Sequence, residues 1–136
     1  MHITQVLNAG IGDVIDVGVH NGPKGKATLL ELDHIRLRLS LSWLEDHSTD
    51  LYPLTLLVGL SRPQTCRKIL EQASTLGASE IHFFVSEKSE PTYRESKLWK
   101  TGEWRDKIEK GVEQAFTTFI PKCQIWTDIG KCLDNQ

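Results

Sequence analysis

Two kinds of hydrophobic pattern divide the chain. Up to about residue 48, apolar and polar positions alternate in short runs, first over residues 15–19 and then over residues 35–42, where Ile and Leu alternate with Arg and Ser. A period of two is typical of strands with one buried face and one wet face. Asn, Gly and Pro at positions 21–25 supply loop chemistry between the runs. The pattern predicts a small antiparallel β module that ends in the polar stretch 45–50.

The second pattern begins after Pro53. Residues 54–60 form an almost continuous apolar run, which is typical of a strand covered on both faces in a parallel sheet. Ser61 and Pro63 provide helix-start chemistry, and apolar residues then recur at steps of three and four until Gly77 provides a stop. A strand followed by a helix predicts the beginning of an α/β unit.

A second strand and helix follow in the same order. Residues 81–85 indicate a buried strand with His82 inside it, and residues 86–93 indicate a polar loop. From about Ser96 the spacing predicts one long helix that Pro121 ends. Its apolar stripe comprises Trp104, Ile108, Val112, Ala115, Phe116 and Phe119.

The last elements complete the predicted fold class. Residues 123–126 favour a third short strand, and Thr127 with Asp128 is typical of the N-cap of one more helix. We expect an α+β protein with a β module over residues 1–50 and an α/β unit with a parallel sheet over residues 51–136. Because the last helix has barely begun at the final residue, we expect the sheet to have an unfinished edge and the chain to be truncated at its C-terminus.

Composition narrows the class of protein further. A chain of 136 residues, 39% hydrophobic and 25% charged, can bury a core without disulfides, so disulfide miniproteins and disordered tails are excluded. No apolar run approaches the ~20 residues that cross a bilayer, and no signal sequence is evident, so we expect a cytoplasmic protein without membrane contact. With a formal net charge of −2, the chain as a whole does not attract phosphate backbones, so any nucleic-acid binding must depend on a local group of cations.

Three common kinds of chemistry find no support in the sequence. The loop 21–26 contains Gly and Lys but lacks the spacing of a phosphate-binding loop, so a hairpin is favoured. The five histidines never occur at metal-ligand spacing, and we propose no metal site. Cys66, Cys123 and Cys132 lack a paired spacing and an evident base partner, which favours buried reduced thiols.

Residues 94–110 are basic, with Trp99 and Trp104 interleaved. Cations and aromatic rings in this mixture can hold an RNA backbone and stack a base. The alternative is that Trp104 belongs to the apolar stripe while the cations pair with neighbouring carboxylates on a solvated face, and composition alone favours this alternative. The cations are Arg94, Lys97, Lys100, Arg105, Lys107 and Lys110.

An ordered series of short motifs resembles one known family over essentially the whole chain. The motifs are His2-Ile3, Val6-Leu7, Gly12-Asp13, Gly59-Leu60-Ser61-Arg62, Leu76-Gly77, Ser86-Glu87-Lys88-Ser89, Trp104, Lys107-Ile108, Glu113-Gln114 and Pro121. Their order and spacing resemble the RsmE family of 16S ribosomal RNA (uracil-N3)-methyltransferases.

This resemblance implies a fold and an activity. Family members carry a PUA-like β-barrel that contacts RNA, followed by a SPOUT-type α/β domain whose C-terminal trefoil knot binds S-adenosylmethionine and forms the homodimer. The reaction implied is methyl transfer to a ring nitrogen of a uridine in the RNA of the small ribosomal subunit. Such a reaction requires the sulfonium methyl to be held in line with that nitrogen, on a base out of its stack.

The chain departs from the family pattern in two ways. The family's cofactor loops, a Gly-Pro-Glu-Gly-Gly segment and a Leu-Arg-x-Glu-Thr segment, would lie beyond Gln136. We therefore expect this chain alone neither to bind S-adenosylmethionine nor to contain the dimer surface. Several positions where the family carries charged side chains are also uncharged here, at Gln5, Asn8, Gln72, Thr75, Thr117 and Phe119, and Lys88 replaces an arginine.

The resemblance suggests six residues for RNA contact and assigns no catalytic residue. Arg62 follows the first α/β strand, and Lys88 lies in the loop after the second. Arg94 and Arg105 belong to the basic stretch, while Glu113 and Gln114 match a pair that the family places near its site. For Lys88 the competing interpretation is a solvated loop residue, and for Glu113 and Gln114 it is a solvated helix face.

Two functional hypotheses follow from the sequence. The first is a fragment or shortened member of an RsmE-like methyltransferase that is completed elsewhere. The second is a non-catalytic RNA-binding or scaffold protein that kept the β module and part of the α/β domain. A weaker third possibility is a structural module whose exposed sheet edge pairs with another chain.

Overall fold

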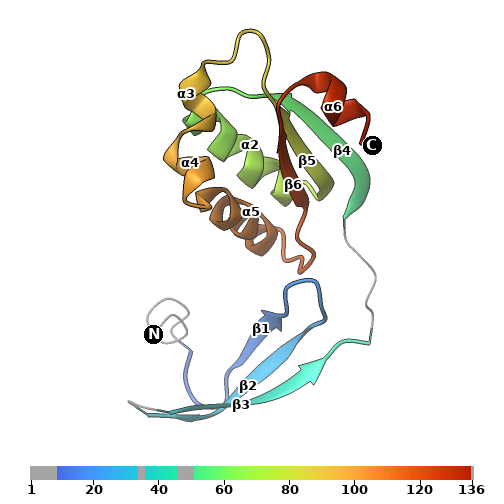
Figure 1. Cartoon of the computed structure of the whole chain (residues 1–136). Coiled ribbons are helices and arrows are strands. Elements are labelled where there is room, and N and C mark those ends of the chain that lie inside the picture. Colours follow the sequence, from blue (N-terminus) through green and yellow to red (C-terminus); the bar gives the residue numbers. More distant parts are fainter. Residues whose placement is uncertain (1–8, 34–35, 46–50, 136) are drawn as a thin grey trace. The chain divides into compact units, whose positions relative to one another are not determined.

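The computed structural model describes residues 9–33, 36–45 and 51–135. The chain divides into two compact units, residues 1–48 and residues 49–136. Figure 1 traces both units and labels their helices and strands.

Unit 1 contains an antiparallel sheet in the order β1-β2-β3. The strands are β1 (Val14–Gly18), β2 (Lys24–Leu32) and β3 (Leu37–Trp43). The residues between β1 and β2 form the hairpin that the sequence predicts, with Asn21 in the left-handed region at φ 54°. Ala27 and Leu29 are fully buried, so the middle strand β2 carries the core of this unit.

Unit 2 is an α/β unit with a parallel sheet in the order β4-β5-β6. Its long helices α2 and α5 lie together on one face of the sheet (Figure 1). The antiparallel sheet of unit 1 and this parallel sheet confirm the predicted α+β class. In chain order the elements are β4 (Tyr52–Gly59), α2 (Pro63–Thr75), β5 (Ala78–Phe84), α3 (Pro91–Arg94), α4 (Lys97–Lys100), α5 (Glu103–Gln114), β6 (Lys122–Trp126) and α6 (Ile129–Leu133).

The prediction that the strand at 54–60 is covered on both faces is wrong. β4 is an edge strand of the described sheet, and Leu54 and Leu57 expose 53% and 36% of their surface. The central strand is β5, in which Ile81 and Phe83 are fully buried. An unbroken apolar run shows that a strand is hydrophobic, but it does not show where the strand lies in the sheet.

The predicted long helix from Ser96 to Pro121 is also wrong in its bounds. Gly102, in the left-handed region at φ 80°, separates α4 from α5 and forms the N-cap of α5. At the other end α5 stops at Gln114, so Ala115, Phe116 and Phe119 of the predicted stripe lie beyond the helix, and Phe116 is exposed rather than packed in the core. Within the described residues, no helix is long and apolar enough to cross a membrane.

Helices α2 and α5 approach each other closely at Gly111. A β-carbon built on Gly111 would lie 2.3 Å from the carbonyl oxygen of Glu71 and 2.7 Å from Ser74 Cβ. The Thr75 hydroxyl donates to the Gly111 carbonyl at 3.3 Å and also to the Glu71 carbonyl at 2.9 Å. Absence of a side chain at Gly111 therefore allows the two helices to pack backbone against backbone over the sheet.

Candidate functional site

The carboxyl edge of the parallel sheet is the first candidate site. Open α/β sheets bind ligands at this edge, where the loops after the strands converge. Beyond the ends of the strands, the Leu60 amide donates to Phe84 O at 2.7 Å, and the Val85 amide donates to Trp126 O at 3.1 Å. The loops that leave β4 and β5 therefore begin side by side.

A serine pair fixes the loop after β5. The Ser89 hydroxyl donates to the Leu60 carbonyl at 2.6 Å and accepts the Ser86 amide at 3.0 Å. Because that hydroxyl's own proton goes to Leu60, the Ser86 hydroxyl donates in the 3.0 Å contact between the two side chains. These bonds tie the loop after β5 to the end of β4.

Arg62 and Lys88 are held by these two joined loops. Arg62 is the exposed N-cap residue of α2, and Pro63 occupies the first helical turn behind it. Lys88 is exposed between Ser86 and Ser89. The structure thus places these two predicted cations on neighbouring loops at one edge of the sheet.

The other two predicted cations lie on the helical segment beyond this loop. Arg94 is exposed at the end of α3. Arg105 lies over Trp104, with its guanidinium carbon 4.6 Å from the ring centroid. Trp104 packs against the core of unit 2, as its helical spacing predicts. With one side of the indole on the core and a guanidinium over the ring, Trp104 is a poor platform for a base.

Glu113 and Gln114 lie far from Arg62 and Lys88. Both are exposed at the C-terminal end of α5. Helix α5 runs back toward the opposite edge of the sheet, where β6 begins at Lys122. At 1.5 Å per residue, Glu113 lies about 12 Å along the helix axis from Arg105. The six predicted residues therefore do not form one site.

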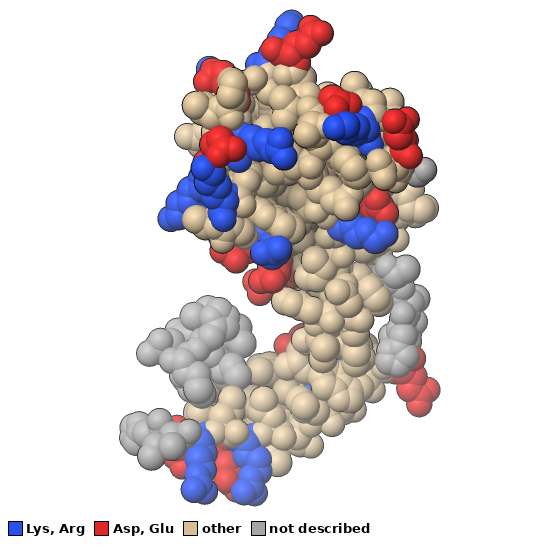
Figure 2. Space-filling view, in the orientation of Figure 1, with Lys and Arg blue, Asp and Glu red and all other residues tan. Residues whose placement is uncertain are grey.

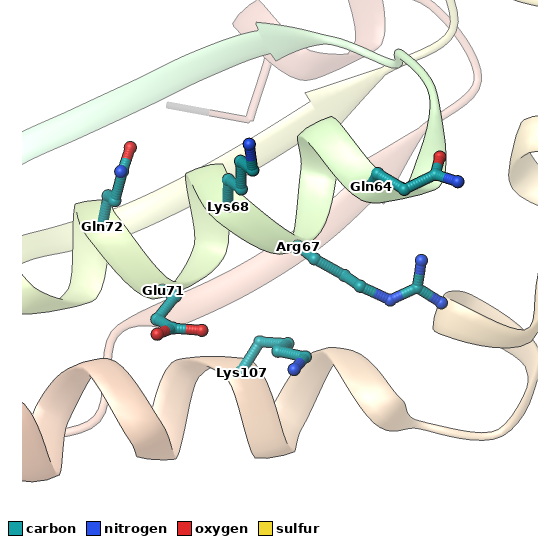
Figure 3. A pocket seen from close by; sticks show the side chains of 6 residues that line it. All are labelled: Gln64, Arg67, Lys68, Glu71, Gln72 and Lys107. Atoms are coloured by element: carbon teal, nitrogen blue, oxygen red, sulfur yellow. The ribbon is translucent and has the colours of Figure 1, made fainter.

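A shallow groove between α2 and α5 is a feature that sequence reasoning missed. It has a volume of about 300 Å³, and Figure 3 shows the side chains that line it. Arg67 crosses to Glu103 through two hydrogen bonds, of 2.7 Å from Nε and 3.0 Å from Nη2. The lining residues are Gln64, Arg67, Lys68, Glu71, Gln72 and Lys107. No local spacing predicts a pair that is 36 residues apart.

The Arg67–Glu103 pair changes the acid–base properties of both partners. The hydrogen bond from Arg67 lowers the pKa of Glu103 below its ordinary value, and the same bond raises the pKa of Arg67. Two parallel bonds between a guanidinium and a carboxylate fix orientation as well as charge. The pair therefore joins the first turn of α5 to the middle of α2.

A second missed feature is a chain of polar contacts on β5 and β6. Trp126 Nε1 donates to His82 Nδ1 at 2.8 Å, so in the neutral ring the proton is on Nε2, 2.8 Å from Glu80 Oε2. Lys122 Nζ lies 3.2 Å from the other Glu80 oxygen. His82, and to a smaller extent Lys122, lower the pKa of Glu80. The sequence predicts that His82 is buried, which its 3% exposure confirms, but not these partners.

Cysteine and metal chemistry have little basis in the described residues. No group of three His, Cys, Asp or Glu side chains in the described ranges could hold a metal ion. Cys66 is buried, and its thiol donates to the Ser61 carbonyl at 3.3 Å. Burial raises the pKa of Cys123 to about 12, so this thiol stays protonated near neutral pH.

Charge is dispersed on the surface of unit 2. Figure 2 shows Lys and Arg side chains mixed with Asp and Glu on the face in view, without one large basic patch. This agrees with 16 basic against 18 acidic residues in the chain. Any attraction to a phosphate backbone must therefore come from a few local cations.

Comparison with known proteins identifies the family. Residues 48–136 match the family described as an RNA methyltransferase domain. The ribosomal RNA small subunit methyltransferase E of Treponema pallidum is 34% identical over 120 residues, which cover 88% of this chain and 45% of that protein. The ribosomal RNA small subunit methyltransferase E 1 of Borreliella burgdorferi is 29% identical over 86 residues, covering 63% of this chain and 36% of that protein.

A solved structure shows the same fold. The ribosomal RNA small subunit methyltransferase E of Neisseria gonorrhoeae, bound to S-adenosyl methionine, superposes with a TM-score of 0.71 at 19% identity. The alignment covers 98% of this chain and 56% of that chain. The chain therefore belongs to the RNA methyltransferase family, and within it to the RsmE group, as the ordered motifs predict. It spans about half the length of these relatives.

The Arg67–Glu103 pair predicts a specific dependence of stability on pH. Because the pKa of Glu103 is lower in the folded chain, the pair stabilises the fold above the ordinary carboxyl value of 4.5. This contribution is lost as the pH falls from 4.5 through the lower folded value. In urea unfolding, the free-energy difference between wild type and Glu103→Gln should be constant from pH 7 to pH 5 and shrink below 4.5.

An exposed loop carboxylate provides the control for this prediction. Glu87→Gln should leave the free energy of unfolding close to the wild-type value across the same pH range. If wild type and Glu103→Gln give parallel curves down to pH 3, the Arg67 contact does not stabilise the ionised carboxylate.

Proposed function

We propose that the α/β unit presents an RNA-contacting edge of an RsmE-type, S-adenosylmethionine-dependent methyltransferase in the cytoplasm. The substrate is a uridine ring nitrogen in the 16S RNA of the small ribosomal subunit. Membership of the RNA methyltransferase family supports this proposal. The observation that carries it is the bond from Ser89 to the Leu60 carbonyl, which joins the loops of Arg62 and Lys88.

The two cations have different tasks in this proposal. A guanidinium can hold a phosphate through two parallel hydrogen bonds, which fixes the direction of approach, whereas an ammonium acts as a compact point charge. Arg62 stands on the rigid start of α2, and Lys88 stands on the serine-tied loop. Together they position two backbone phosphates at the edge where the cofactor of an α/β protein is expected.

We infer that the described residues alone do not supply a complete site for S-adenosylmethionine. Such a cofactor needs a concave, mostly apolar pocket. At the carboxyl edge, the Ser86 hydroxyl bonds to Ser89 and the Ser89 hydroxyl bonds to the Leu60 carbonyl, and the groove between α2 and α5 is lined by polar side chains. We therefore propose that cofactor binding and homodimer formation depend on sequence that corresponds to the uncovered half of the relatives.

Removing either cation should weaken RNA binding in a salt-dependent way. For a single strand, each lost phosphate contact lowers the slope of log affinity against log salt by about 0.7. We expect Arg62→Ala and Lys88→Ala each to show this drop and a weaker affinity for a fluorescein-labelled, 12-nucleotide oligouridine RNA, measured by fluorescence anisotropy.

Lys68 offers a matched control for these variants, because it is exposed on α2 away from the carboxyl edge. Lys68→Ala should leave both the affinity and the salt slope unchanged. A larger loss of RNA affinity for Lys68→Ala than for Arg62→Ala and Lys88→Ala would indicate that RNA binds at the α2–α5 groove and not at the carboxyl edge.

The second candidate function is a non-catalytic RNA-binding or scaffold protein. The polar lining of the α2–α5 groove, which does not suit a mostly apolar cofactor pocket, favours it. Titration calorimetry of the full chain with S-adenosylmethionine tests the expectation, shared by both candidates, that the chain by itself does not bind the cofactor. We expect no heat of binding for the chain by itself, in either case. Heat of binding at one site per chain would contradict our interpretation of the cofactor site and make this chain a complete cofactor-binding protein.

A further inference from the structure

The two long helices of unit 2 end in the same way but with different residues. After α2, Leu76 caps the helix and Gly77 takes the left-handed conformation at φ 79°. After α5, Ala115 caps the helix and Phe116 takes the left-handed conformation at φ 53°. Glycine is the usual residue at this position, because it has no β-carbon. Phe116 therefore occupies a backbone position that disfavours it.

The turn around Phe116 is firmly fixed. The Phe116 amide donates to Glu113 O at 3.1 Å, and the Thr117 amide donates to Val112 O at 3.2 Å. This pair of bonds is the Schellman pattern of helix ends. The two threonines that follow Phe116, Thr117 and Thr118, expose only 8% and 6% of their surface. The turn is thus held by α5 on one side and by the buried threonines on the other.

The phenyl ring gains little from packing within unit 2. Phe116 exposes 74% of its surface, although a left-handed backbone is a true outlier for so bulky a side chain. Strained residues that persist in a fixed surrounding are concentrated where they contact ligands. The fixed turn therefore presents an aromatic ring to an external partner at a cost to the fold.

The surroundings of Phe116 match an unpaired RNA base. The exposed polar side chains of Glu113 and Gln114 precede it, and the exposed cation Lys110 lies on α5. Lys122, at the start of β6, is also exposed, although its ammonium pairs with Glu80. A base stacks on an aromatic ring while its edges meet polar groups and its phosphates meet cations. We propose that Phe116 is a stacking platform for an unpaired base of the RNA substrate.

This proposal rests on the RNA substrate proposed above and adds a second contact region to it. The strand β5 has seven residues, so the two edges of the sheet lie about 23 Å apart at 3.3 Å per residue. Even at the 3.4 Å rise per nucleotide of a fully stacked strand, about seven nucleotides span this distance, and an extended single strand needs fewer. A 12-nucleotide RNA is therefore long enough to contact Arg62 and Lys88 at one edge and Phe116 at the other.

Leu76 helps to distinguish stacking from apolar docking. It also exposes 74% of its surface at the end of the parallel helix α2, but its backbone is relaxed at φ −79°. A protein partner that covered an apolar surface would use both side chains. Base stacking requires the aromatic ring and makes no use of Leu76.

The test compares three variants of the full chain with the labelled 12-nucleotide oligouridine RNA. Phe116→Gly should raise the urea midpoint, because glycine relieves the left-handed strain, and still weaken RNA binding by about fivefold or more. Its salt slope should equal that of wild type, because no phosphate contact is lost. Phe116→Trp should bind within twofold of wild type, and Leu76→Ser should not change binding.

Each contrary result has a distinct meaning. A stabilised Phe116→Gly that binds RNA like wild type overturns the stacking role, and the proposed function stands if Arg62→Ala and Lys88→Ala still lower the salt slope. Equal losses in Phe116→Gly and Leu76→Ser, with altered self-association on size-exclusion chromatography, overturn stacking in favour of an apolar docking surface. If wild type binds no RNA at low salt, both proposals fail.

Discussion

The hydrogen bond from the Ser89 hydroxyl to the Leu60 carbonyl is the contact on which the candidate site depends. It closes the loop after β5 onto the end of β4, so that the exposed Lys88 and Arg62 belong to two joined loops. Without it, the two cations would stand on independent loops, and each would lose conformational freedom separately on binding a phosphate. The bond is short, at 2.6 Å, and half-buried, so water competes poorly with Ser89 for the Leu60 carbonyl.

The central strand β5 explains how this edge is held in place. Ile81 and Phe83 point into the core under α2 and α5, and Phe83 makes an edge contact with Trp99, with 5.0 Å between ring centroids. Between them, His82 joins β5 to β6 through Trp126. One strand therefore anchors both the helical layer and the neighbouring strand, and the loops of the site leave from its end and that of β4.

The sequence predicts the order of the elements better than their surroundings. Alternation, helical spacing and Pro63 locate the strands and the start of α2, because these signals are local. The prediction of one long helix fails at Gly102 and Phe116, because left-handed backbone conformations, rather than hydrophobic spacing, determine where α5 begins and ends. The prediction that β4 is covered on both faces fails for another reason. Its edge position follows from the order of strands in the whole sheet, which local sequence does not specify.

The candidate site was predictable only in part. Arg62 and Lys88 follow strands, so a parallel sheet brings them to one edge by topology alone. Glu113 and Gln114 lie elsewhere because α5 carries them back along the sheet. The Arg67–Glu103 pair and the left-handed turn at Phe116 have no signature in local spacing, because each depends on packing between distant segments or on a costly backbone angle.

Mapping RNA contacts by nuclear magnetic resonance on the ¹⁵N-labelled full chain is the most direct test of the central claim that the carboxyl edge faces RNA. During titration with the 12-nucleotide oligouridine, the amide signals of residues 60–62 and 86–89 should shift together along one binding curve. Shifts confined to the residues of the α2–α5 groove, with the carboxyl-edge amides unchanged, would contradict this account.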